Sequence, residues 1–105
     1  MKERDLSIAT ELKQRLSALA SLVDFRVFGS RARGDADEHS DLDVFVEVEH
    51  LDPSLKERLL DLAWEVGLEH LTVISLLIYT RDEIEHTPYR SSPIVKVIAR
   101  EGVRV

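Results

Sequence analysis

Apolar residues recur at steps of three and four in the first quarter of the chain, and mostly polar or charged residues fill the positions between them. The recurring positions are Leu6, Ala9, Leu12, Leu16, Leu19 and Val23. This spacing places the apolar side chains along one side of a helix. The pattern therefore predicts an amphipathic helix that packs against a core.

Two short strands are predicted after this helix, with a polar segment between them. Residues 25–28 are rich in aromatic and branched side chains, and Gly29 ends the run. Residues 34–40 are polar and turn-prone. We therefore expect a loop there that reverses the chain, so that the two strands pair antiparallel or nearly so.

The second predicted strand, residues 41–49, alternates between two sets of side chains. Leu42, Val44, Val46 and Val48 occupy every second position, and Asp41, Asp43, Phe45, Glu47 and Glu49 occupy the positions between them. Successive side chains of a strand point to opposite faces, so the first set is predicted to enter a core. Asp41 and Asp43 then share the other face.

A second helix is predicted to begin at Asp52 and Pro53, because aspartate caps helices and proline is favoured at the first helical position. Its buried side is predicted to consist of Leu55, Leu59, Leu62, Ala63 and Val66. Gly67 is expected at the end of this helix or near its last turn.

Residues 71–79, LTVISLLIY, form a nearly continuous apolar and branched run. Such a run predicts a central strand that is covered on both faces. After a charged stretch, Ser92 and Pro93 predict a last helix that continues through Arg100 and stops at Gly102.

The alternation of predicted helices and strands indicates an α/β (α+β) fold, and the composition fits a single domain over residues 1–105. The 105 residues are 44% hydrophobic and 32% charged, which is enough for one core. No apolar run approaches the roughly 20 residues needed to cross a bilayer, and the first residues are charged where a signal peptide would be apolar. We therefore expect a cytoplasmic protein without membrane contact.

The absence of cysteine restricts the possible chemistry. With no cysteine in the chain, disulfides, zinc–thiolate sites and cysteine nucleophiles are excluded. Any metal must be bound by oxygen or histidine. Magnesium is the natural candidate.

Charge argues against general binding to nucleic acid. Fourteen basic and twenty acidic residues give a net charge of −6, and no basic block stands out. Arg26, Arg31 and Arg33 are the local exception, because three guanidinium groups surround one glycine–serine turn. They could neutralise a polyphosphate, although ordinary surface arginine is the alternative interpretation.

Residues 29–43, GSRARGDADEHSDLD, carry the candidate chemistry. Gly29 lets the backbone approach phosphate oxygens, and the hydroxyl of Ser30 and nearby N–H groups supply donors. Asp41 and Asp43 lie about 6.6 to 6.8 Å apart along one strand face, where both carboxylates can hold a hard cation against the same phosphates. Two aspartates at this spacing are more often merely solvated, and the upstream glycine–serine pair reverses that preference.

The pattern G-S-x10-D-x-D resembles the minimal nucleotidyltransferases of the DNA polymerase beta superfamily. Gly29, Ser30, Asp41 and Asp43 carry the resemblance, and Gly34 and Ser40 also stand where relatives usually have them. The resemblance implies a short mixed sheet flanked by helices. It also implies that Gly29, Ser30 and Ser40 contact a nucleoside triphosphate and that Asp41 and Asp43 bind magnesium. The transferred group would be a nucleoside monophosphate, commonly AMP from ATP.

One departure from the family concerns a third carboxylate, which active members typically carry on the next core strand. Residues 71–79 contain no acid, and Ser75 falls near the expected position. The serine hydroxyl is a poor general base and a weaker ion ligand than a carboxylate. Glu69, just before the strand, and Glu47, on the face of the two aspartates, are the possible substitutes.

Three functions remain open from the sequence. The resemblance points to a small helical HEPN-type toxin as partner, with this chain as the antitoxin that transfers AMP to a hydroxyl of that protein. A second reading is a nucleotide-binding module that acts on its partner by contact, which the acid-free strand favours. A third is transfer to a small hydroxylated molecule such as an aminoglycoside.

Overall fold

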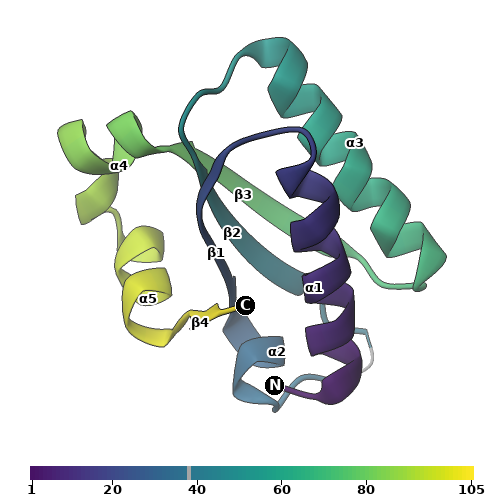
Figure 1. Cartoon of the computed structure of the whole chain (residues 1–105). Coiled ribbons are helices and arrows are strands. Elements are labelled where there is room, and N and C mark those ends of the chain that lie inside the picture. Colours follow the sequence, from purple (N-terminus) through teal and green to yellow (C-terminus); the bar gives the residue numbers. More distant parts are fainter. Residues whose placement is uncertain (38) are drawn as a thin grey trace.

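The computed structural model describes residues 1–37 and 39–105 (Figure 1). Glu38, which belongs to the predicted loop between Gly34 and Ser40, lies outside the described residues. Within the described part, none of the helices has the length and apolar character needed to cross a membrane.

Four strands of the described chain form one mixed sheet, as the resemblance implied. They are β1 (Leu22–Phe28), β2 (Leu42–Val48), β3 (Ile74–Thr80) and β4 (Val103–Arg104), and their order across the sheet is β3-β2-β1-β4. β1 pairs antiparallel with β2 and with β4, whereas β2 and β3 are parallel. The predicted chain reversal between the first two strands is therefore confirmed.

Helices cover both faces of the sheet. They are α1 (Glu3–Ser17), α2 (Gly29–Arg33), α3 (Pro53–Glu69), α4 (Arg81–His86) and α5 (Pro93–Glu101), with a 3-10 turn, η1 (Pro88–Ser91), between the last two. α1 and α3 lie on one face, and α4 and α5 lie on the other (Figure 1). α3 is the crossover that two adjacent parallel strands require.

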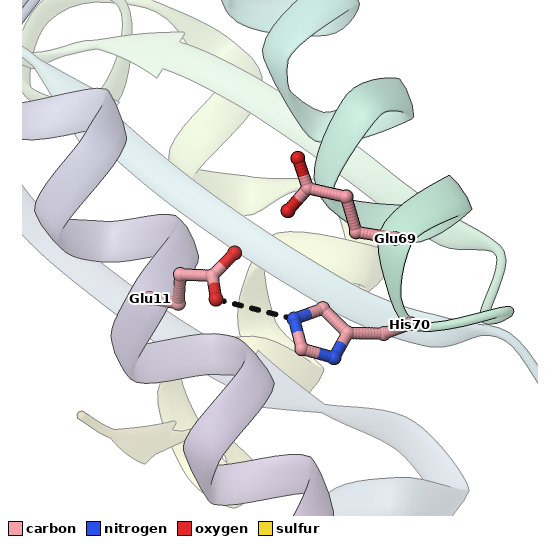
Figure 2. Close-up of side chains that lie close together, drawn as sticks. All are labelled: Glu11, Glu69 and His70. Carbon is pink, nitrogen blue, oxygen red and sulfur yellow. Dashed lines mark hydrogen bonds and ion pairs between the residues drawn. The ribbon is translucent and has the colours of Figure 1, made fainter.

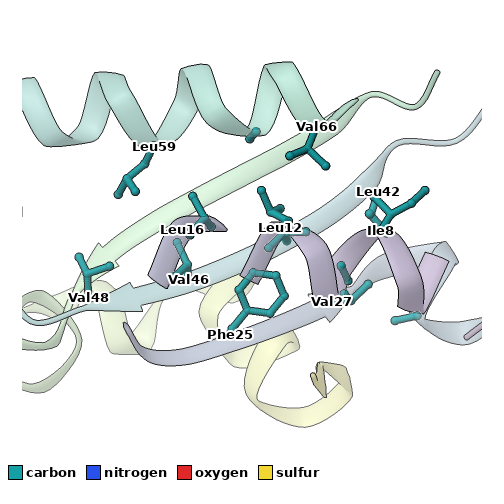
Figure 3. Close-up of a cluster of buried hydrophobic side chains, with 14 residues drawn as sticks. Ile8, Leu12, Leu16, Phe25, Val27, Leu42, Val46, Val48, Leu59 and Val66 are labelled. Atoms are coloured by element: carbon teal, nitrogen blue, oxygen red, sulfur yellow. The ribbon is translucent and has the colours of Figure 1, made fainter. Parts of the chain in front are cut away.

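The main core lies between the sheet and the helix pair α1 and α3 (Figure 3). Its fully buried side chains include Ile8, Leu12, Leu16, Leu42, Val44, Val46, Val48, Leu59 and Val66. The predicted alternation along β2 is confirmed, because the side chains of Leu42, Val44, Val46 and Val48 all belong to this core. A smaller cluster on the opposite face contains Phe28, Phe45 and Ile98.

The predicted helix starts at Asp52 and Ser92 are also confirmed. The Asp52 carboxylate accepts a hydrogen bond from the backbone N–H of Leu55 at 2.8 Å, and Pro53 occupies the first turn of α3. The Ser92 hydroxyl accepts from the N–H of Val95 at 3.3 Å. Each cap satisfies a donor that the first helical turn leaves without an intrahelical partner.

The prediction for the first helix was too long at its C-terminal end. α1 ends at Ser17, Val23 lies on β1 with its side chain exposed, and Leu6 is also exposed. The buried side consists of Ile8, Ala9, Leu12 and Leu16, together with Asp5. Leu19 and Val23 match the helical spacing by coincidence, because Leu19 lies in the turn after α1 and Val23 lies on β1.

The prediction of a central strand over residues 71–79 was wrong in position. β3 begins at Ile74 and forms an edge of the sheet, and each of its residues is half-buried. Leu71 and Val73 precede the strand and are exposed. The apolar run reflects helices on both faces of β3, which side-chain periodicity cannot distinguish from a central location.

Three short elements were not predicted from the sequence. α2, α4 and β4 have between two and six residues, too few for a hydrophobic period to emerge. α4 nevertheless begins with a capping box, in which Thr80 accepts from the N–H of Glu83 and the Glu83 carboxylate accepts from the N–H of Thr80.

Candidate functional site

The two motif aspartates lie at one end of the sheet, where β1 finishes and β2 and β3 begin. Phe28, the last residue of β1, is paired with Asp43 on β2, and Asp43 is in turn paired with Ser75 on β3. Asp41 comes directly before β2. The strand register therefore brings the aspartates beside the glycine–serine segment that follows Phe28.

Gly29 is in close contact with Asp43. It begins α2 with a φ of +74°, and a Cβ atom built on it would lie 2.6 Å from Oδ2 of Asp43. Glycine is the residue that both the backbone angle and the space allow. From the sequence, Gly29 was predicted to allow close approach by phosphate, and in the structure it also allows close approach by the carboxylate of Asp43.

The carboxyl of Asp43 carries an unfavourable charge in the free protein. Partial burial raises the pKa of Asp43 above its usual value, and the nearby charge of Asp41 raises this pKa further. Both effects disfavour an ionised Asp43 when no cation is present. A divalent cation would offset both the cost of burying the charge and the repulsion from Asp41, so these two carboxylates suit a metal site.

The donor set of the pair suits magnesium. Mg²⁺ is commonly held by one or two carboxylates together with substrate phosphates and water. Asp41 is exposed and Asp43 is half-buried, so the pair faces solvent on one side and the sheet on the other. Carboxylates on one side and open space on the other would admit phosphate oxygens to the same ion.

The start of α2 supports a phosphate beside these aspartates. No side chain caps this helix, so its first N–H groups are not bound by a capping residue. Ser30 stands in this turn, and its carbonyl accepts from the N–H groups of Gly34 and Asp35 at 3.0 and 3.1 Å. A φ of +82° lets Gly34 end the short helix.

Arg31 points inward in this structure. Its side chain is 6% exposed, its Nη1 lies 2.7 Å from Oδ1 of the buried Asp5, and its Nε and Nη2 donate to the carbonyl of Ser40 at 3.0 and 2.6 Å. The nucleotide contact predicted for Arg31 stays a prediction. Its observed contacts join α1 to the residue that precedes Asp41.

The role of Asp5 was not predicted from the sequence. Its signal was present, because a carboxylate three and four residues before Ile8 and Ala9 falls on the buried side of α1. A charged residue there requires a partner. Arg31 supplies that partner.

The other predicted phosphate contacts are nearer to solvent. Arg33 is exposed, and its guanidinium lies 3.2 Å from Asp35. Arg26 on β1 is bound to Asp24 at 2.8 Å, away from the aspartate pair. Ser40 is half-buried, and its hydroxyl donates to Asp37 at 3.2 Å.

Of the three residues considered for the missing carboxylate position, only Ser75 adjoins Asp43. Parallel register places the two residues as neighbours on one face of the sheet. Glu47 shares this face but lies four residues along β2, about 13 Å away, with Phe45 between. Glu69 ends α3 on the opposite face and is bound to Arg15 at 3.2 Å.

A second group of possible metal ligands lies elsewhere, where α1 meets the end of α3 (Figure 2). Glu11, Glu69 and His70 bring ligand atoms within 4.8 Å of one another, and His70 Nε2 lies 3.2 Å from Glu11. The guanidinium of Arg15 already forms ion pairs with both carboxylates of this group, at 3.5 Å from Glu11 and 3.2 Å from Glu69. We therefore interpret it as an ion-pair cluster that joins the two helices.

Comparison with known proteins agrees with this geometry. The family model described as a nucleotidyltransferase domain matches residues 8–104. A relative in Methanocaldococcus jannaschii, named "Putative protein adenylyltransferase MJ0141", is 36% identical over 95 residues, which cover 82% of this chain and 89% of the relative.

Solved structures share the fold. A toxin–antitoxin crystal structure with AMP-PNP is 18% identical, with a TM-score of 0.57 over 99% of this chain and 72% of the other. A "putative minimal nucleotidyltransferase" is 24% identical, with a TM-score of 0.55 over 92% of this chain and 95% of the other. These identities support the fold alone. The family match over almost the whole chain, together with the relative at 36% identity, shows that this protein belongs to the nucleotidyltransferase domain family.

Proposed function

We propose that the chain transfers AMP from ATP to a hydroxyl group of a partner protein. The oxygen of the acceptor hydroxyl would form a bond to the α-phosphorus. The bond between that phosphorus and the oxygen leading to the β-phosphate would break, and pyrophosphate would leave as the hydroxyl proton is released. A cytoplasmic location, as the sequence predicts, fits the use of ATP.

The observation that carries this proposal is the close packing of Asp43 against Gly29. It brings a carboxylate with a raised pKa beside the uncapped start of α2, so that the proposed cation and phosphate sites would adjoin. Asp41 and Asp43 would hold Mg²⁺. When bound, this ion supplies positive charge that stabilises the phosphates during transfer.

The remaining residues would orient the nucleotide. Backbone N–H groups at Gly29 and Ser30, with the Ser30 hydroxyl, would donate to phosphate oxygens, and Arg33 would add charge from the solvent side. Arg31 would hold the Ser40 carbonyl and so position Asp41. Direct phosphate contact by Arg31 or Ser40 would require the side chain to leave its present partner.

A protein acceptor is supported by the relatives. The M. jannaschii relative is named for protein adenylyltransfer, and one solved neighbour is a toxin–antitoxin complex. By this analogy the partner would be a small helical HEPN-type protein, and this chain its antitoxin. The net charge of −6 disfavours a nucleic-acid acceptor.

Incubation with α-labelled ATP, Mg²⁺ and the candidate partner tests the proposal. We expect label to appear on the partner and to depend on Mg²⁺, and we expect γ-labelled ATP to leave the partner unlabelled. Label transferred from the γ position would contradict nucleotidyl transfer. Binding of nucleotide and partner without any transfer would support the contact-only module.

The contact-only module is the second candidate function, because Ser75 occupies the position beside Asp43 where active relatives are expected to carry an acid. If the missing carboxylate limits turnover, Ser75→Asp should raise the Mg²⁺-dependent transfer rate by about 10-fold or more, since such groups contribute roughly 10²- to 10⁴-fold elsewhere. Single-turnover labelling measures this rate.

Ser75→Asn is the matched control for Ser75→Asp, because it has the same shape without the negative charge. We expect Ser75→Asn to leave the rate near that of the natural chain. An equal increase in both variants would mean that side-chain volume, rather than a third carboxylate, limits the reaction.

A further inference from the structure

The outer edge of β3 is open along the described chain. β2 pairs with one side of β3, and no strand among the described residues pairs with the other. A groove of about 370 Å³ follows this edge, and four consecutive β3 residues, Leu76 to Tyr79, line it. Since neighbouring side chains point to opposite faces, a groove that touches all four follows the strand backbone itself.

An exposed apolar stripe of α3 accompanies this edge. Leu60, Trp64 and Leu68 are spaced four residues apart, so they lie along one side of the helix, and they are 41%, 66% and 57% exposed. Leu60 lines the groove beside Leu76 to Tyr79, and Trp64 and Leu68 line a second hollow of about 180 Å³ with Ile74. Leu71 and Val73 extend the apolar surface and are also exposed.

An open strand edge beside exposed apolar side chains is a surface at which another strand can add. We propose that a second copy of this chain covers it, with β3 of one copy antiparallel to β3 of the other. The proposed two-fold axis passes near Ser75 and Trp64. This inference does not depend on the proposed nucleotidyl transfer.

The sequence of the stripe favours a second copy. A two-fold interface requires a surface that matches itself, and the order leucine, tryptophan, leucine is symmetric about Trp64. Rotation about the axis places Leu60 of one copy against Leu68 of the other. On β3, the same axis pairs Ser75 with Ser75 at the centre, and it places Ile74 opposite Leu76 and Val73 opposite Leu77, so apolar residues face each other on both sides of the serine pair.

Charge is complementary in the same arrangement. α3 has no basic residue in its last turn, and at its C-terminal end Arg4 of α1 donates to the carbonyl of His70, so the carbonyls before His70 lack a cation from their own helix turn. The antiparallel arrangement places Lys56 of one copy near the end of α3 in the other. Two such contacts arise, one for each copy.

The exposed apolar side chains supply most of the area that a standard dimer interface needs. Leu60, Trp64, Leu68, Leu71 and Val73 together expose on the order of 600 Å² per copy, taking about 150 to 250 Å² for each fully exposed side chain. The strand backbone and Tyr89 add to this area. A standard interface buries roughly 800 Å² per partner.

The dimer would place both aspartate pairs on one face of a continuous sheet. Asp43 and Ser75 share the face opposite α3, and an axis perpendicular to the sheet preserves that face in both copies. The two Asp43 strands would be separated by three strand spacings, about 14 Å across the sheet.

Sedimentation equilibrium with the whole chain tests the proposal. We expect a mass approaching twice the 12.0 kDa of one chain at tens of micromolar protein. Trp64→Glu should weaken the dimer by at least roughly 30-fold, the effect expected for an aromatic residue at the centre of an interface. Leu6→Glu is the matched control, because Leu6 is an exposed apolar residue of α1, and this variant should dimerise normally.

A single introduced cysteine tests the axis, since the chain has none of its own. Ser75→Cys should form a disulfide-linked dimer under mild oxidation, whereas Leu77→Cys, which lies away from the axis, should not. A monomeric natural chain, an unaffected Trp64→Glu dimer, or equal crosslinking of the two cysteine variants would overturn the proposal. So would a natural chain that stays monomeric and binds its partner protein only when Trp64 is intact.

Discussion

Asp43→Asn is expected to abolish Mg²⁺-dependent nucleotide transfer and, without metal, to stabilise the folded protein. Loss of a metal ligand removes several kcal/mol of charge stabilisation, which corresponds to at least about 100-fold in rate. The gain in stability follows from burial and the neighbouring Asp41, which together raise the pKa of Asp43.

The sign of the stability change follows from proton linkage. Because the pKa of Asp43 is higher in the folded chain than in the unfolded chain, the folded state holds this proton more tightly. The resulting stabilisation is complete below the unfolded pKa and is lost as pH rises through the folded pKa. At neutral pH the ionised carboxylate therefore opposes folding, and the neutral amide of Asn removes that opposition.

Thermal unfolding and labelling measured side by side check both effects. Mg²⁺ with nucleotide should raise the Tm of the natural chain and leave that of Asp43→Asn unchanged. Asp41→Asn and the double variant should also lose transfer, whereas Asp61→Asn, at an exposed position of α3, should keep it. Undiminished labelling by the double variant would show that these aspartates do not hold the required cation.

The parts of the fold that the sequence predicted correctly depend on local chemistry. Alternation along β2 and the caps at Asp52 and Ser92 involve residues a few positions apart, so the chain alone reveals them. The position of β3 at the sheet edge does not depend on local chemistry. It depends on which strands pair, and an apolar run has the same appearance at the edge and in the centre when helices cover both faces.

The same distinction holds for the candidate site. The aspartate pair and the glycine–serine turn could be predicted from spacing, because β2 and its preceding loop are continuous in sequence. The inward orientation of Arg31 could not, since its partner Asp5 lies 26 residues earlier on another helix. The contact between Gly29 and Asp43 likewise emerged only from the register of β1 with β2.

Gly29→Ala is expected to abolish transfer, whereas Gly34→Ala is expected to retain it. Both glycines have positive φ, so either alanine costs about 1 to 2 kcal/mol of stability from backbone strain. Only the new methyl at position 29 would meet Oδ2 of Asp43, at 2.6 Å, whereas nothing lies within 4 Å at position 34. Displacement of this carboxylate should reduce the labelling rate by at least about 100-fold.

Combining Gly29→Ala with Asp43→Ala distinguishes the steric clash with the Asp43 carboxylate from the backbone strain at position 29. Removing the carboxylate leaves the new methyl at position 29 without the atom it would strike, so in that background Gly29→Ala should cost about as much stability as Gly34→Ala. In the natural background Gly29→Ala should cost clearly more, and the difference is the coupling between the two positions. Urea unfolding of the set measures it. If the changes in unfolding free energy from Gly29→Ala and Asp43→Ala were additive, the two residues would not be in contact. The cation and phosphate sites proposed beside them would then not be adjacent.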